Sequence, residues 1–135
     1  MSQPIIFKHT INVGLEDLDE LNHVNNVVYI SYLQEAAIAH WLNSVSKETV
    51  DGIRWVVRKH EIEYFKAAFE KDILVVSTWI SEYTQISSVR QYEIKRGNEL
   101  LLKATTLWIA LNAKTLKPAR VPKYIHESFF DSSRL

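Results

Sequence analysis

The feature that most constrains the fold is a long helical stretch, residues 26–45, that is apolar over most of its circumference. No glycine or proline interrupts it, and apolar residues recur at steps of three or four: Ile30, Leu33, Ala37 and Trp41. Further apolar residues lie off this stripe: Val27, Val28, Tyr32, Ala36, Ile38 and Leu42. Asn25 or Asn26 can cap the helix, because an asparagine side chain accepts a hydrogen bond from an unpaired first-turn amide. A helix coated in this way is expected to be surrounded by other elements.

Period-two patterns predict strands on both sides of this helix. One strand, residues 5–13, precedes the helix and ends at Gly14. After a polar link at residues 44–52, four strands are predicted at residues 53–65, 73–81, 88–95 and 100–111. Gly97-Asn98 fits a tight turn between the last two, and a short terminal helix is predicted at residues 124–130. Short connections favour antiparallel pairing, so we predict an α+β fold with a five-stranded antiparallel sheet wrapped around one long central helix.

The composition indicates a single globular domain, residues 1–135, with 47% hydrophobic and 24% charged residues. Sixteen basic residues balance sixteen acidic ones without a basic cluster, which argues against nucleic acid as a partner. The absence of cysteine removes thiol catalysis and disulfides and fits a reducing compartment. No signal peptide pattern and no apolar run near the ~20 residues of a membrane span is present, so we expect a cytoplasmic protein without a membrane partner. One helix leaves much of the sheet uncovered, which predicts a homodimer at least.

Polar groups with catalytic potential gather just before the helix. Asp17 and Asp19 can serve as nucleophile toward an acyl carbon or as general base toward water, and both roles improve near a helix N-terminus. The alternative is that they cap the helix. His23 can orient a carboxylate or hydrogen-bond a carbonyl oxygen, or it can simply be bonded to the loop backbone. A metal site of these three residues is disfavoured, since their spacing fits neither an EF-hand nor paired histidine ligands.

The sequence contains no motif for a serine nucleophile, a phosphate-binding loop or a dinucleotide-binding site. Arg58, Lys59 and Lys66 fit solvated charges better than a phosphate site. His60 is predicted to be a satisfied core histidine, and Glu35 to need a structural partner if buried.

The segment Asp17-Leu18-Asp19, with His23-Val24-Asn25-Asn26 and Tyr29 after it, resembles the opening motif of hotdog-fold acyl thioesterases. This family includes the 4-hydroxybenzoyl-CoA thioesterase-like enzymes and the plant acyl-ACP thioesterases. Three later segments are similar to the same family: residues 61–72, 107–112 and 117–122. The resemblance implies a hotdog fold, hydrolysis of an acyl thioester such as acyl-CoA, and active sites at a dimer interface.

The resemblance also implies roles for individual residues. The catalytic carboxylate of the 4-hydroxybenzoyl-CoA branch corresponds to Asp19, and the histidine of the plant-type motif corresponds to His23. Backbone amides near Asn25 and Asn26 are expected to stabilise the oxyanion, with a second donor from the partner's strand near Trp55. The residues expected to contact the acyl chain are Val28, Tyr29 and Val57.

One position departs from the plant-type motif, because Leu21 stands where those enzymes place a catalytic asparagine.

No cofactor is expected, and coenzyme A enters only as part of the substrate. An acyl carrier protein is the alternative carrier, and a tetramer is the alternative to a dimer. Two other functions stay open for this fold: an acyl dehydratase, and a non-catalytic module that binds an acyl ligand or an acyl carrier.

Overall fold

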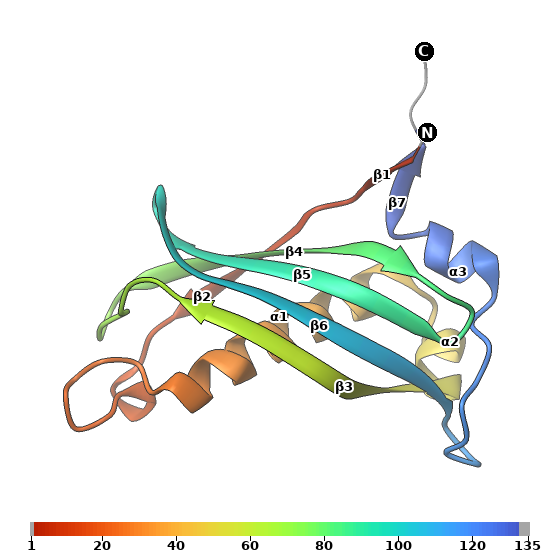
Figure 1. The fold of residues 1–135 in the computed structure, drawn as a ribbon, viewed down its shortest axis with the longest axis horizontal. Helices are drawn as coiled ribbons and strands as arrows, with labels where there is room; N and C mark the ends of the chain where they lie inside the picture. The colour runs from red at the N-terminus through yellow and green to blue at the C-terminus, as the bar shows by residue number, and fades with distance from the viewer. Residues whose placement is uncertain (1, 133–135) are drawn as a thin grey trace.

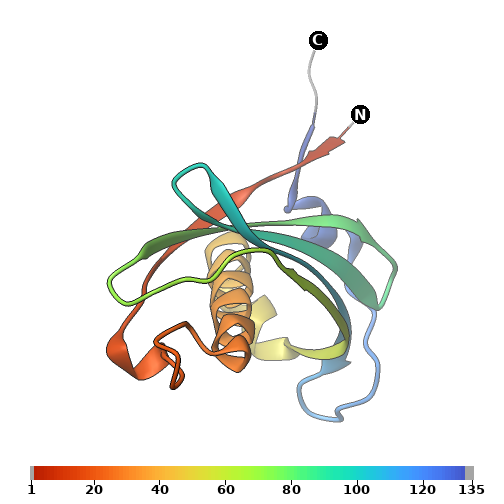
Figure 2. The same ribbon diagram turned by 60° about the vertical axis from the view of Figure 1, so that its left-hand side comes forward.

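The computed structural model describes residues 2–132 of the 135-residue chain. Its elements in chain order are β1 (Ser2–Pro4), β2 (Phe7–Asn12), the 3-10 turn η1 (Leu15–Asp17), α1 (Asn26–Ser44), α2 (Lys47–Gly52), β3 (Ile53–Tyr64), β4 (Ile73–Tyr83), β5 (Ser87–Arg96), β6 (Glu99–Asn112), α3 (Lys123–Glu127) and β7 (Phe130–Ser132). The long helix α1 lies in the concave face of a strongly curved sheet (Figure 1; Figure 2). The predicted central helix and its four following strands are confirmed.

The main sheet has five strands in the order β2-β4-β5-β6-β3, and every neighbouring pair is antiparallel. The tight turn between β5 and β6 contains Gly97, whose φ of +60° is in the left-handed region that glycine adopts without steric cost. The long strand β3 forms one edge of the sheet and pairs only with β6 within the described chain. Its other edge therefore presents unpaired backbone groups.

The core forms where α1 meets β4, β5 and β6. The helix contributes Tyr29, Leu33 and Ala36. Strands β4, β5 and β6 contribute six large buried side chains: Leu74, Val76, Tyr92, Ile94, Leu101 and Leu102. Full burial of a large apolar side chain stabilises the fold by about 1.5–3 kcal/mol, so this layer fixes the helix on the sheet.

The buried face of α1 differs from the predicted stripe. Its buried residues are Tyr29, Tyr32, Leu33, Ala36, Ala37 and His40, whereas Ile30 and Trp41 are only half-buried. Val27, Ile38 and Leu42 remain more than half exposed, at 71%, 54% and 55%. The sheet of one chain covers one side of the helix, so the helix is not fully surrounded and one apolar flank stays uncovered.

Three short elements, α2, β1 and β7, were not predicted. The link at residues 44–52, expected to be irregular, contains α2, whose first turn is capped by Ser46 accepting a hydrogen bond from the Thr49 amide across 3.2 Å. The terminal segments β1 and β7 pair with each other as a separate two-stranded sheet beyond the main one (Figure 1). All three elements are too short for hydrophobic periodicity to mark them.

The surface charges and structural partners follow the sequence interpretation. Glu35 is exposed, so it does not need a buried partner, and its Oε2 lies 2.9 Å from His9 Nε2. His60 is half-buried, and its Nδ1 lies 2.7 Å from the Thr106 hydroxyl. Lys59 and Lys66 form exposed ion pairs with neighbouring glutamates. Among residues 2–132, none of the helices is both long enough and apolar enough to cross a membrane.

Candidate active site

The loop between β2 and α1 is anchored to the helix through Asp17. Asp17 Oδ2 accepts hydrogen bonds from the Gly14 amide at 3.0 Å and from the Tyr32 hydroxyl at 2.8 Å. The backbone carbonyl of Asp17 also accepts a hydrogen bond from the Asn25 amide at 2.9 Å. These contacts place Asp17 in a structural role, with its carboxylate turned toward the helix.

Asp19 sits at the start of a tight turn directly before the helix. The turn is closed by the antiparallel bridge between Leu18 and Val24, with the Asp19 amide donating to the His23 carbonyl at 2.8 Å. Asp19 Oδ1 accepts two backbone hydrogen bonds, from Leu21 at 2.9 Å and from His23 at 3.2 Å. The half-buried carboxylate is thus held in one orientation by the backbone of its own loop.

His23 lies on the opposite arm of the same turn. Its half-buried ring meets Phe69 edge-on at a centroid distance of 5.2 Å, and the next residue, Val24, donates to the Ala68 carbonyl at 2.9 Å. Within residues 2–132, the imidazole makes no hydrogen bond to the Asp19 carboxylate. The structure brings the two predicted catalytic residues onto one turn but does not join them as a bonded pair.

The start of α1 leaves one backbone donor free. Asn25 is the N-cap, and its side chain accepts a hydrogen bond from the Val27 amide at 2.9 Å, as predicted. The Asn26 carbonyl accepts a hydrogen bond from the Tyr64 hydroxyl at 3.2 Å. The Asn26 amide has no acceptor in the described part of the chain. A free N–H at the positive end of a helix can stabilise an anion.

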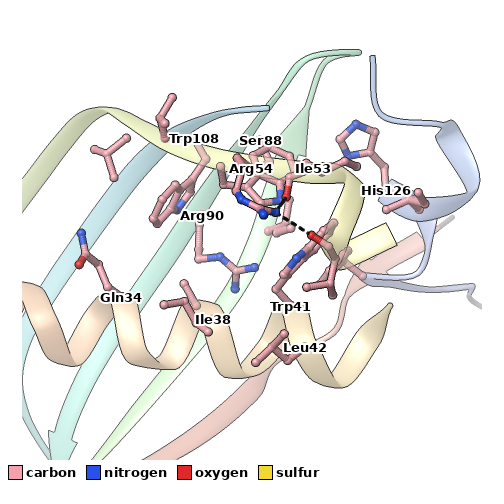
Figure 3. A pocket seen from close by; sticks show the side chains of 18 residues that line it. Gln34, Ile38, Trp41, Leu42, Ile53, Arg54, Ser88, Arg90, Trp108 and His126 are labelled. Atoms are coloured by element: carbon pink, nitrogen blue, oxygen red, sulfur yellow. Dashed lines mark hydrogen bonds between the residues drawn. The ribbon is translucent and has the colours of Figure 1, made fainter. Parts of the chain in front are cut away.

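A cavity of about 520 Å³ opens between the C-terminal half of α1 and strands β3, β5 and β6 (Figure 3). Three of the four tryptophans line it, namely Trp41, Trp55 and Trp108, and Trp41 meets Trp55 edge-on at a centroid distance of 5.6 Å. Val57 also lines this cavity. Trp55 and Val57 are predicted site residues, Trp55 as part of the partner's strand, and both line this cavity in one chain.

A charged side chain reaches this cavity from β5. Arg90 is only 4% exposed, and its Nη1 donates to His40 Nδ1 at 2.9 Å and to the Thr78 hydroxyl at 3.1 Å. Burial, followed by the neighbouring guanidinium, lowers the pKa of His40 to about 4, so this histidine is neutral at pH 7. Burial also lowers the pKa of Arg90 to about 10, which leaves it charged.

Sequence reasoning missed Arg90 and His40. A signal was present, because Ser88, Arg90 and Tyr92 alternate along β5 and therefore share its inward face. A charged residue at an inward position of a sheet needs a partner or a function.

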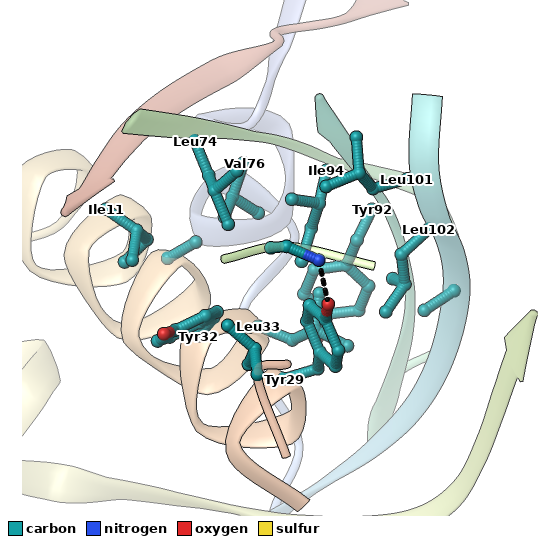
Figure 4. Close-up of a cluster of buried hydrophobic side chains, with 14 of the residues drawn as sticks. Ile11, Tyr29, Tyr32, Leu33, Leu74, Val76, Tyr92, Ile94, Leu101 and Leu102 are labelled. Atoms are coloured by element: carbon teal, nitrogen blue, oxygen red, sulfur yellow. Dashed lines mark hydrogen bonds between the residues drawn. The ribbon is translucent and has the colours of Figure 1, made fainter. Parts of the chain in front are cut away.

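The two other predicted acyl contacts lie elsewhere. Tyr29 is buried in the core, and its hydroxyl accepts a hydrogen bond from the Ala68 amide at 3.0 Å (Figure 4). This burial raises the pKa of Tyr29. Val28 is half-buried and packs against the same core cluster. Neither residue lines the cavity, whose first lining residue on α1 is Gln34.

The sequence has relatives of known activity. YbgC of Escherichia coli, an acyl-CoA thioester hydrolase, is 27% identical over 128 residues, which cover 92% of this chain and 96% of that protein. The chloroplastic acyl-(acyl-carrier-protein) hydrolase FATB3 of Cuphea viscosissima is 31% identical over 85 residues. That match covers 58% of this chain and only 21% of the plant protein.

Solved structures and a family model agree with these relatives. The probable thioesterase YbaW of Escherichia coli superposes with a TM-score of 0.79 at 25% identity, covering 90% of this chain and 95% of YbaW. The fold is also shared with the DHNA-CoA thioesterase of Staphylococcus aureus, with a TM-score of 0.82 at 23% identity and coverage of 92% and 88%. Residues 13–129 match the model of the Thioesterase-like superfamily. The chain has the hotdog fold and belongs to the Thioesterase-like superfamily, as a thioester hydrolase.

Proposed function

We propose that the chain hydrolyses acyl thioesters, acyl-CoA foremost, with Asp19 as the reacting carboxylate. The supporting observation is the hydrogen bonding of Asp19. Oδ1 is occupied by two backbone amides, whereas Oδ2 has no hydrogen-bond partner within residues 2–132. A carboxylate held by one oxygen, beside the start of a helix, has its second oxygen available for reaction.

Two routes use this oxygen. In the first, Asp19 Oδ2 attacks the thioester carbonyl carbon, the C–S bond breaks to release a thiolate, and water then hydrolyses the mixed anhydride. In the second, Oδ2 takes a proton from water, whose oxygen attacks the same carbon, and the C–S bond then breaks to release the thiolate. Either route passes through an oxyanion, to which the free Asn26 amide can donate. His23 is proposed to donate a hydrogen bond to the same carbonyl oxygen. The acyl-CoA preference is supported by the activity named for YbgC.

We infer that the functional unit is a homodimer joined along β3. The exposed charges on this edge strand change sign along its length: Arg54, Arg58 and Lys59 come first, then Glu61 and Glu63. An antiparallel pairing of two copies of β3 sets the basic part of each strand against the acidic part of the other. This pairing would also satisfy the unpaired edge.

Such a dimer would bring the Asp19 turn of one chain to the cavity of the other. The C-terminal end of β3 lies at the start of α1, as the hydrogen bond from Tyr64 to Asn26 shows. The N-terminal end of β3 carries Trp55 and Val57, which line the cavity. Antiparallel pairing sets these two ends of neighbouring strands side by side. The acyl group would then enter the cavity of one chain while its thioester reacts at the turn of the other.

The experiment is thiol release from a series of acyl-CoA substrates by Asp19→Asn. Asparagine keeps the Oδ1 acceptor, so the turn is retained and only the reactive oxygen is lost. We expect kcat to fall at least a hundredfold, roughly the loss of ~3 kcal/mol of transition-state stabilisation, with an unchanged free energy of unfolding. The matched control is Glu20→Gln, which neutralises the adjacent exposed carboxylate and should retain activity. Wild-type turnover in Asp19→Asn would reject the assignment.

A further inference from the structure

The positive charge of Arg90 has no counter-ion in the described chain. Its two hydrogen-bond partners, His40 and Thr78, are neutral at pH 7. None of the ion pairs among residues 2–132 includes Arg90. Burying an ion without a partner of opposite charge costs several kcal/mol, and proteins seldom keep such a group without a use for it.

Some of the N–H groups of Arg90 have no hydrogen-bond acceptor within residues 2–132. A guanidinium has five N–H groups, and the two on Nη1 are taken by His40 and Thr78. The N–H groups of Nε and Nη2 have no acceptor within residues 2–132. Among residues 2–132, His126 Nε2 is the only fully buried side-chain nitrogen or oxygen atom without a hydrogen-bond partner. Nε and Nη2 of Arg90 also lack a partner, so these two atoms are not fully buried. Arg90 lines the cavity, so its free donors face that space (Figure 3).

The remaining walls of the cavity are mainly apolar. Aromatic and aliphatic side chains form most of them: Trp41, Trp55, Trp108, Phe129, Ile38 and Leu42. No aspartate or glutamate is among the lining residues. Figure 3 shows the Arg90 side chain reaching from the sheet toward Ile38 and Trp41 of α1. The lining also includes a second arginine, Arg54, which is exposed and whose Nη1 donates to the Val50 carbonyl at 3.2 Å. The cavity thus combines a large apolar volume with one buried cation, Arg90.

We propose that this cavity binds a molecule with an apolar body and a single carboxylate, and that the free donors of Arg90 receive the carboxylate. A planar carboxylate matches the fork of a guanidinium in geometry as well as charge, and it supplies the missing counter-ion. The tryptophans and aliphatic side chains cover the apolar body. A cavity of about 520 Å³ lies in the size range of small-molecule sites.

Two sources present this chemistry. One is a free carboxylic acid with a hydrocarbon chain. The other is an acyl thioester whose acyl group ends in a carboxylate far from the sulfur, which would name the substrate class of the proposed thioester hydrolysis and in that form rests on it. The binding experiment below involves no turnover, so its outcome is independent of whether Asp19 is the reacting group.

The binding test follows the intrinsic fluorescence of the tryptophans lining the cavity. Dodecanoate, below its micellar concentration, is expected to change this fluorescence saturably, and uncharged dodecanol to bind at least tenfold more weakly. In Arg90→Met the dodecanoate affinity should fall at least tenfold while the dodecanol affinity stays within twofold. Arg120→Met removes an exposed arginine outside the cavity and is the matched control. If Arg90→Met does not fold, Arg90→Lys, which keeps the positive charge but lacks the guanidinium, is measured in its place.

The second arm separates the two sources. The value of kcat/KM is compared between dodecanedioyl-CoA, which ends in a carboxylate, and dodecanoyl-CoA of the same length. A preference of tenfold or more for the first, lost in Arg90→Met, identifies a carboxylate-ended thioester as the ligand. Dodecanoate binding through Arg90 without this preference identifies a free acid. Equal binding of dodecanoate and dodecanol to the wild-type protein, without any thioester preference, overturns the proposal.

Discussion

The Tyr32 hydroxyl donates a hydrogen bond to Asp17 Oδ2 across 2.8 Å, and this contact separates the roles of the two loop aspartates. Burial and then the Asp17 carboxylate raise the pKa of Tyr32, so its hydroxyl stays protonated and remains a donor. The same Asp17 oxygen also accepts the Gly14 amide. Asp17 therefore ties the loop to α1, while the carboxylate of Asp19 is held only by its own turn.

Replacing Tyr32 with phenylalanine should destabilise the protein without altering Asp19, the proposed reacting carboxylate. Loss of a partly buried hydrogen bond to a charged acceptor should lower the free energy of unfolding by about 2 kcal/mol. Urea denaturation followed by circular dichroism measures this change. Tyr124→Phe, which alters an exposed tyrosine, is the control and should be neutral. An unaltered unfolding midpoint in Tyr32→Phe would show that the contact contributes nothing to the loop.

The sequence predicted the fold well because its long elements are strongly periodic. The predicted helix at residues 26–45 and the four strands predicted after it differ from the structure by at most two residues at either end. The buried face of the helix was less predictable. The prediction put Trp41 on the buried stripe, whereas in the structure His40 is buried. The His40 imidazole can be buried because it is hydrogen-bonded to Arg90 on the opposing sheet. A hydrogen-bond partner that is distant in the sequence does not affect the local hydrophobic periodicity, so the pattern cannot predict it.

The geometry of the candidate site could be predicted only where its residues are close in sequence. The turn from Asp19 to His23 and the cap at Asn25 form within one loop, so a local pattern identifies them. The cavity collects residues from α1, β3, β5 and β6, which no spacing rule brings together. Tyr29 was assigned to the acyl chain from its place in the motif, whereas packing holds it in the core against the Ala68 amide.

The cap of α1 should contribute to stability separately from catalysis. In Asn25→Ala the Val27 amide loses its acceptor, and such cap losses typically cost about 1 kcal/mol. Asn25→Ser restores an acceptor and should recover most of this loss. Thermal unfolding of the three proteins measures the effect. If Asn25 acts only as a cap, kcat in Asn25→Ser will match that of the wild type, and a persistent fall in kcat would instead assign the asparagine amide a direct role.

Stability should decrease as the pH falls from about 6.5 to about 4, in part because of His40. Its pKa is about 4 in the folded protein, against 6.5 for an unperturbed histidine, so between these pH values the unfolded chain binds more protons. The contribution of His40 is therefore complete above pH 6.5 and is lost toward pH 4. A difference of this size corresponds to at most about 3 kcal/mol.

Urea denaturation at a series of pH values tests this dependence. His40→Gln removes the titrating group, so the slope of unfolding free energy against pH should become shallower in this window. Burial also lowers the pKa of His60 and His126, so a smaller slope of the same sign should remain. An identical slope in the wild type and His40→Gln would show that His40 does not titrate differently in the two states.

Assembly along β3 should depend on the sign change of its charges. Arg58 and Glu63 are both exposed, and neither forms an ion pair within the described chain. In an antiparallel pair of β3 strands, Glu63→Arg sets like charges against the basic part of the neighbouring strand. Like charges across an interface oppose association, so we expect self-association to weaken roughly tenfold or more. The effect should diminish at high salt, because exposed charges are screened.

The reciprocal change should rescue the dimer. Arg58→Glu combined with Glu63→Arg reverses both signs and restores complementarity, so the double variant should associate better than either single variant. Sedimentation analysis over a range of concentrations measures association, and thiol release from acyl-CoA should follow it because each proposed site needs both chains. A wild-type protein that stays monomeric yet fully active would place the complete site within one chain and would remove β3 pairing from the mechanism.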